Sequence, residues 1–197
     1  MTSYAKADTL IAAALSPMDL TRTVSLVIAF SLFNALAAQF AIYIGPIPIT
    51  GQTFAVTLTG ALLGSRLGAA ALIAYLIEGA LGLPFFAGSR GGIGVMLGPS
   101  AGYLVSFPAA AYITGAFAEH GWDRRFLTAA AAMAIGSVVI LLGGWAWLMV
   151  YLRATPLVAF KMGVAPFLIG DVIKIVLAAA VLPTGWAFLK RRASGGN

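Results

Sequence analysis

Six apolar runs make up most of this sequence, and runs of this kind are typical of membrane-crossing helices. A straight helix needs roughly 20 apolar residues to cross the hydrocarbon core of a bilayer. The 197 residues are 61% hydrophobic and 9% charged, whereas a soluble domain carries about 25% charged residues. The sequence therefore predicts an all-α integral membrane protein of one domain with six transmembrane helices. The predicted spans are about 24–44, 52–63, 67–81, 103–117, 126–152 and 166–189.

The second and third runs are short for a straight crossing. Non-helical backbone at that depth is tolerated only where protein or a cavity covers it. We expect these helices either to extend into their loops or to be broken and end inside the membrane. Ahead of the first span, residues 4–16 are expected to form a short amphipathic helix on the membrane surface or a flexible tail, and we expect no cleaved signal peptide.

The positive charges predict that both termini lie on the inner, cytoplasmic side of the cell membrane. Cytoplasmic loops carry the excess of Lys and Arg. With six spans, the inner side receives Lys6, Arg22, Arg66, Arg124, Arg125, Lys190, Arg191 and Arg192, and the outer side Arg90, Arg153 and Lys161. The cations are scattered between apolar runs, which is typical of a topology signal and does not favour nucleic-acid binding.

Two opposite charges stand three residues apart inside the last predicted span. Asp171 and Lys174 share one face of a helix, and unpaired charge in hydrocarbon costs several kcal/mol. A carboxylate accepts hydrogen bonds from a ligand, and an ammonium pairs with an anion. A buried ion pair that locks two helices is the alternative. We favour a small-ligand pocket in the outer half of the membrane.

Other polar and aromatic residues fall on the same side. Tyr75 and Glu78 share a helix face near the outer end of the third span, Gln52 follows a loop with two prolines, and Trp145 lies near the outer end of the fifth span. All four are candidate ligand contacts. Alternatively, Glu78 is solvated at the interface and Trp145 belongs to an interfacial aromatic belt. The loop before Gln52 acts either as a semi-rigid lid over the pocket or as a plain helix connector.

The sequence contains few residues suited to catalysis or to metal binding. One histidine and no cysteine make a transition-metal site improbable, and a phosphate-binding loop is absent. The segment Gly98–Gly102 matches G-x-S-x-G, but His120 falls across the membrane from Ser100. We expect no catalytic residue, metal or cofactor. The alternative, an intramembrane enzyme that acts on a lipid or prenyl substrate, would need more acids, bases or metal ligands.

Five short motifs follow one another along the chain, and each occurs once. They are Pro46–Thr53 (PIPITGQT), Gly60–Gly64 (GALLG), Gly79–Phe86 (GALGLPFF), Gly98–Leu104 (GPSAGYL) and Gly170–Lys174 (GDVIK). Together they resemble the BioY family, the biotin-specific substrate-binding components of energy-coupling factor (ECF) transporters. Ser100, Ala101 and Ile169 depart from the Thr, Gly and Pro expected for that family.

The resemblance implies capture of biotin from outside, with uptake driven by a transmembrane energy-coupling subunit and two ATPase subunits. It implies that Asp171 and Lys174 contact the ligand, and we assign the ureido end of biotin to Asp171 and its carboxylate to Lys174. It also implies that Ala37 and Ala41, a small-residue stripe on the first helix, face the transmembrane partner, whereas packing within the chain is the alternative. A subunit for a different small carboxylate is the competing interpretation.

Overall fold

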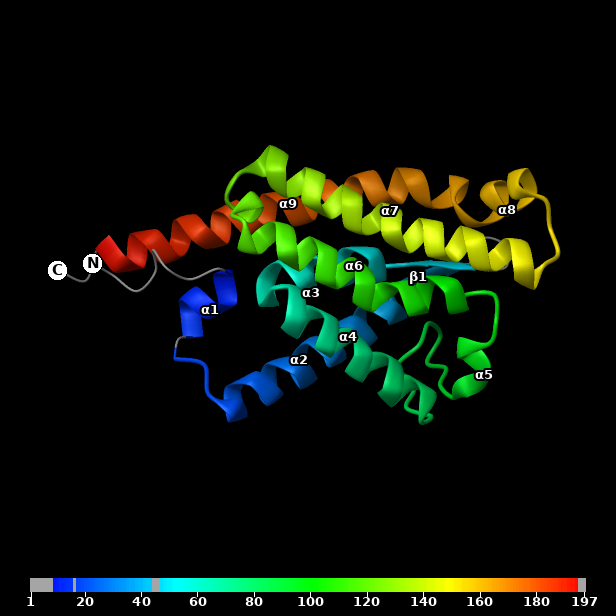
Figure 1. Cartoon of the computed structure of the whole chain (residues 1–197), viewed down its shortest axis with the longest axis horizontal. Helices are drawn as coiled ribbons and strands as arrows, with labels where there is room; N and C mark the ends of the chain where they lie inside the picture. The colour runs from blue at the N-terminus through cyan, green and yellow to red at the C-terminus, as the bar shows by residue number, and fades with distance from the viewer. Residues whose placement is uncertain (1–8, 16, 44–46, 195–197) are drawn as a thin grey trace.

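The computed structural model describes residues 9–15, 17–43 and 47–194, and most of them are helical (Figure 1). The elements in chain order are α1 (Leu10–Leu15), α2 (Leu20–Gln39), β1 (Ala41–Tyr43), β2 (Pro48–Thr50), α3 (Gln52–Leu63), α4 (Ser65–Ala80), α5 (Ile93–Met96), α6 (Ala101–Glu119), the 3₁₀ helix η2 (Trp122–Arg124), α7 (Phe126–Tyr151), α8 (Pro156–Gly163) and α9 (Ala165–Ser194).

Among the described residues, four helices, α2, α6, α7 and α9, are long and apolar enough to cross a membrane. The protein is therefore a multi-pass membrane protein. Helices α3 and α4 have 12 and 16 residues, so a full crossing by each of them stays a prediction. The longer helices run along the long axis of the molecule, with α5 and α8 near one end and the α6–α7 connection at the other (Figure 1).

A one-residue turn separates the two short helices. Gly64 alone joins α3 to α4, and its φ of 88° is a conformation that favours glycine. Glu119, at the end of α6, accepts hydrogen bonds from the backbone N–H of Ser65 at 2.7 Å and from its hydroxyl at 2.9 Å. This carboxylate therefore caps the start of α4, and the two apolar runs form separate helices that meet at a tight turn.

Small residues bring α6 close to its neighbours at the centre of the bundle. A Cβ atom on Gly60 of α3 would lie 2.2 Å from the carbonyl oxygen of Ala111. A Cβ atom on Gly102 of α6 would lie 2.3 Å from the carbonyl oxygen of Gly143 on α7. Both distances are far inside van der Waals contact, so backbone packs on backbone at these crossings, as in other membrane bundles.

The first long helix ends earlier than predicted. Helix α2 stops at Gln39, and Ala41–Tyr43 pairs antiparallel with Pro48–Thr50, so that Ala41 lies opposite Thr50. The all-α prediction is therefore corrected by one short hairpin. Ala37 is buried, with its carbonyl oxygen 3.0 Å from a Cβ atom built on Gly51. Because Ala41 is on a strand and Ala37 packs inside the chain, the predicted helical stripe does not form.

The N-terminal segment forms a helix over Leu10–Leu15, while residues 4–8 and 16 lie outside the described residues. Ala13 on this helix is buried. A Cβ atom on Gly185 of α9 would lie 2.6 Å from Leu10 Cδ1. This part of the predicted amphipathic helix therefore packs on the bundle, against the last helix.

Candidate functional site

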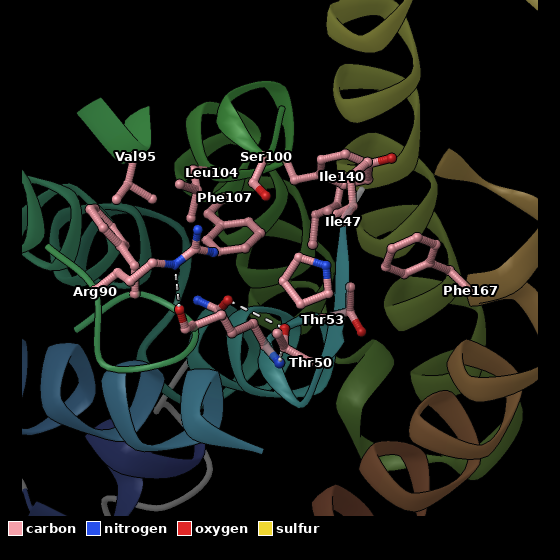
Figure 2. Close-up of a pocket in the computed structure, with 15 residues that line it drawn as sticks. Ile47, Thr50, Thr53, Arg90, Val95, Ser100, Leu104, Phe107, Ile140 and Phe167 are labelled. Carbon is pink, nitrogen blue, oxygen red and sulfur yellow. Dashed lines mark hydrogen bonds between the residues drawn. The ribbon is translucent and has the colours of Figure 1, made fainter. Parts of the chain in front are cut away.

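A partly open cavity lies between the β1–β2 hairpin, the first halves of α3, α6 and α9, and the middle of α7 (Figure 2). Its lining is mostly apolar and aromatic: Ile47, Pro48, Thr50, Gln52, Thr53, Phe86, Ala87, Arg90, Val95, Ser100, Tyr103, Leu104, Phe107, Ile140 and Phe167. Apolar walls with a few convergent polar groups are typical of a small-molecule site. The cavity holds about 40 Å³, well below the roughly 300 Å³ at which such sites begin, so a ligand must widen it.

Arg90 is the cation of this lining. It lies in the segment between α4 and α5, where its backbone pairs with that of Phe86 through N–H···O bonds of 2.9 and 3.2 Å. Its Nε donates to the carbonyl oxygen of Ala87 at 3.0 Å. Figure 2 shows the guanidinium extending towards the ring of Phe107. The terminal N–H groups have no hydrogen-bond partner among the described residues, so they are available to an anion.

Gln52 and Tyr75, two of the predicted ligand contacts, meet beside the cavity. The Gln52 side-chain amide donates to the Tyr75 hydroxyl at 2.7 Å, and that hydroxyl donates to the carbonyl oxygen of Phe85 at 3.3 Å. Gln52 lines the cavity, whereas Tyr75 is fully buried behind it, against Phe86 and Phe107. Tyr75 therefore orients Gln52 and the segment that follows α4.

Asp171 and Lys174 lie directly behind Thr53, which lines the cavity. Asp171 is 4% exposed, and Lys174 Nζ lies 3.3 Å from its Oδ1. Thr53 donates to the same Oδ1 at 2.9 Å and accepts from Lys174 Nζ at 2.9 Å. Ser137 of α7 donates to Oδ2. Asp171 and Lys174 thus form an ion pair with each other, which was the alternative to ligand contact. The hydroxyl of Thr53 lies between this pair and the cavity.

The cluster lies in the first third of α9, and its place in the outer half of the membrane stays a prediction. Asp171 and Lys174 stand six and nine residues from the start of α9 at Ala165. At about 1.5 Å per residue this is about 9 and 13 Å along the helix. The pair lies nearer the end of the bundle that carries α8 than the opposite end (Figure 1).

The other two predicted contacts lie away from the cavity. Glu78 accepts a hydrogen bond from Ser31, which ties α4 to α2. Trp145 donates through its indole N–H to the carbonyl oxygen of Pro156 at 2.9 Å, which ties α7 to α8. Neither residue lines the cavity, and both have packing roles; their ligand contacts stay predictions.

The model of the BioY family matches residues 6–191 of this chain. The chain belongs to the BioY family. The "Probable biotin transporter BioY" of Pyrococcus horikoshii is 40% identical over 161 residues, which cover 81% of this chain and 93% of that relative. The "Biotin transporter BioY" of Rhizobium etli is 33% identical over 194 residues, which cover 91% and 100%.

A solved structure shares the fold. The crystal structure of the S-component for biotin from an ECF-type ABC transporter aligns with a TM-score of 0.76 at 22% sequence identity, over 85% of this chain and 93% of that chain. Within this BioY-family chain, Ser100, one of the departures from the expected family pattern, lines the cavity. The departure therefore lies where it can alter the shape of the site.

The structure adds three residues that the sequence did not single out as site residues: Thr53, Arg90 and Ser137. Arg90 carried a signal, because it is a cation in a glycine-rich segment next to a family motif, but it was counted only as an outer topology charge. Thr53 follows Gln52 at the start of α3. Ser137 gave no signal, since one hydroxyl in a long apolar helix usually bonds its own backbone.

Proposed function

We propose that this chain is the substrate-binding subunit of an ECF transporter and that it captures biotin in the cavity beside the hairpin. The observation that carries the proposal is a cavity with aromatic walls, a polar corner and a guanidinium without an acidic partner among the described residues, in a chain that belongs to the BioY family. Relatives that cover most of the chain are named biotin transporters, and the structural neighbour is an S-component for biotin.

The chemistry of biotin matches the two ends of the cavity. Biotin carries a carboxylate on a flexible chain and a fused bicyclic ring with ureido N–H donors. Arg90 and Phe167 lie on opposite sides of the cavity (Figure 2), and Tyr103 stacks on Phe167 with ring centroids 5.7 Å apart. The carboxylate pairs with Arg90, and the bicyclic ring packs on the aromatic walls.

The ureido group is assigned to the polar corner formed by Gln52 and Thr53, with Asp171 and Lys174 behind them. Asp171 Oδ1 already accepts from Thr53 and Lys174, so a ureido N–H reaches the carboxylate only after Thr53 turns aside. Lys174 faces Asp171 in this state, and for that reason we place the ligand carboxylate on Arg90 in preference to Lys174. The earlier assignment to Lys174 is the competing prediction.

Biotin entry requires one wall of the cavity to move. The hairpin contributes Ile47, Pro48 and Thr50, and the segment after α4 contributes Arg90. Both are loops or two-stranded ribbons, which are easier to displace than the packed helices α6 and α7. The hairpin therefore acts as a lid on the site, in keeping with the lid interpretation of its proline-rich loop.

Transport requires partners, because the sequence contains no phosphate-binding loop. We propose that a transmembrane energy-coupling subunit and two ATPase subunits drive uptake across the cell membrane. The excess of Lys and Arg near α1, the α3–α4 turn, the α6–α7 connection and the end of α9 supports cytoplasmic termini and six crossings. The described residues include no group of three or more potential metal ligands, and nothing in them favours the intramembrane enzyme.

A binding titration tests the function. We expect the purified protein in detergent to bind one biotin per chain, and to bind lipoate, a carboxylate of similar size without a ureido group, much more weakly. Absence of biotin binding would contradict the proposal, and tighter binding of lipoate would favour the subunit for a different carboxylate.

The two carboxylate assignments are separated by a neutral ligand. Arg90→Ala should weaken biotin at least tenfold more than it weakens biotin amide, because only the acid loses an ion pair. Lys174→Ala should weaken both ligands to a similar extent. Lys161→Ala, an exposed cation that does not line the cavity, is the matched control and should leave both affinities unchanged. The reverse pattern would return the carboxylate to Lys174.

A further inference from the structure

We infer that Gln39 is a positioning residue that holds Arg90 in place and so determines selectivity for the ligand carboxylate. The inference rests on the proposed function, because it assumes that Arg90 receives the anionic end of the ligand. Gln39 is the last residue of α2 and does not line the cavity that contains Arg90. Its effect on the ligand must therefore pass through the segment that carries Arg90.

The side-chain amide of Gln39 clamps this segment from both of its ends. Its Nε2 donates to the carbonyl oxygen of Ala35 in its own helix at 3.0 Å, and lies 3.4 Å from the carbonyl oxygens of Phe85 and Phe86. Its Oε1 accepts from the backbone N–H of Ser89 at 2.9 Å and from the Ser89 hydroxyl at 3.2 Å. One side chain thus contacts the residues before and after the turn.

The backbone that it holds has a positive φ at two consecutive positions and is strained at the second, Ser89. Gly88 has a φ of 73° and Ser89 a φ of 54°, and a left-handed conformation at a residue with a side chain costs about 1 kcal/mol or more. Such a conformation persists only when its surroundings fix it. Gln39 holds Ser89, the residue immediately before Arg90, through two hydrogen bonds from outside the segment.

The strained turn also sets where the guanidinium lies. The two backbone hydrogen bonds between Phe86 and Arg90 close the turn, and Arg90 Nε bonds to Ala87 inside it. If Ser89 relaxes to a negative φ, this closure opens and the guanidinium loses its fixed position at the cavity. A mobile cation still attracts an anion, but the entropy of ordering it then opposes binding.

The test compares an acid with its neutral amide on matched variants. Gln39→Met keeps the length and volume of the side chain and removes both hydrogen-bonding functions, and Gln39→Ala removes the side chain. We expect either variant to weaken biotin about tenfold and biotin amide less than twofold. Adding Arg90→Ala to Gln39→Met should cause no further loss for biotin than Arg90→Ala alone, because the clamp acts only through Arg90.

Trp147→Phe is the control, because it removes another hydrogen bond to a loop at the same end, the 2.8 Å bond from its indole N–H to Gly98. It should leave the ratio of acid to amide affinity unchanged. Equal losses of affinity for biotin and biotin amide in Gln39→Met, or no loss of affinity for either, would overturn the inference.

The same titrations separate this inference from the proposed function. If the unmodified protein binds no biotin, both are overturned. If it binds biotin but Arg90→Ala does not distinguish the acid from the amide, the role of Gln39 falls with the assignment of the carboxylate to Arg90, while biotin capture stands.

Discussion

Two buried carboxyl groups at opposite ends of the bundle have contrasting surroundings. Asp171, near the cavity, accepts from Thr53, Ser137 and Lys174. Asp123, in the α6–α7 connection, is 1% exposed and accepts from the indole N–H of Trp186 on α9. Its Oδ1 has no partner among the described residues.

The difference lies in how many polar partners each buried carboxyl group has. A cation and two hydroxyls contact Asp171, whereas burial favours the neutral form of Asp123. Burial raises the pKa of Asp123, although the hydrogen bond from Trp186 and the charge of Arg124 oppose this. Asp171 therefore lies in the cluster next to the candidate site, whereas Asp123 links the α6–α7 connection to α9.

The largest expected effect breaks the outer pair. Lys174→Met leaves Asp171 buried without its cation and should reduce the free energy of unfolding by about 3 kcal/mol, measured by thermal unfolding in detergent. Asp171→Asn with Lys174→Met should recover much of this stability, since a buried pair replaced as a unit is often neutral. Both variants should bind biotin more weakly than the unmodified protein. Equal stability of the single and double variants would show that the charges are independent.

The second prediction concerns the backbone contact that holds the bundle together. Gly60→Ala places a Cβ atom 2.2 Å from the carbonyl oxygen of Ala111 and should reduce the free energy of unfolding by about 1–3 kcal/mol. Gly170→Ala is the control, because nothing lies within 4 Å of the position of its Cβ. It should be neutral or slightly stabilising. Similar losses of unfolding free energy for both variants would contradict the close backbone contact between α3 and α6.

The third prediction uses pH to compare the two ends. Because the pKa of Asp123 is raised above 3.8, its contribution to stability is present at low pH and is lost as pH rises from about 3.8 through the folded-state pKa. Asp123→Asn should remove this fall in thermal stability. Asp19→Asn, which changes an exposed carboxyl at the start of α2, should retain it. Identical pH profiles of Asp123→Asn and the unmodified protein would contradict the raised pKa.

The smallest expected effect concerns Trp145. Trp145→Phe removes one hydrogen bond to Pro156 and should cost about 1 kcal/mol of stability, with biotin affinity unchanged within twofold. A loss of affinity above tenfold would instead bring this indole into the ligand site and confirm the sequence prediction.

The sequence predicted the long helices well where apolar runs have clear ends. Helix α7 begins at Phe126 as predicted, and α6 and α9 extend the predicted spans by a few residues. The end of α2 was missed because Ala41–Tyr43 is as apolar as the helix before it. Hydropathy alone does not distinguish a short strand from a last helical turn.

The sequence singled out candidate site residues where ionisable side chains stand in an apolar run. Asp171 and Lys174 stood out because ionisable residues are rare in membrane spans. Arg90 did not, because an arginine in an outer loop has an ordinary explanation. Only the fold of the glycine-rich segment, clamped by Gln39 from α2, brings that guanidinium into the cavity. Contacts of this kind depend on distant parts of the chain and leave no periodic pattern.

The most direct test of the account is an experimental structure of the protein with biotin bound. We expect the ligand carboxylate within hydrogen-bond distance of Arg90, the bicyclic ring against Phe107, Tyr103 and Phe167, and the ureido group facing Gln52 and Asp171. Biotin bound outside this cavity, or with its ends reversed so that the carboxylate meets Lys174, would contradict the account.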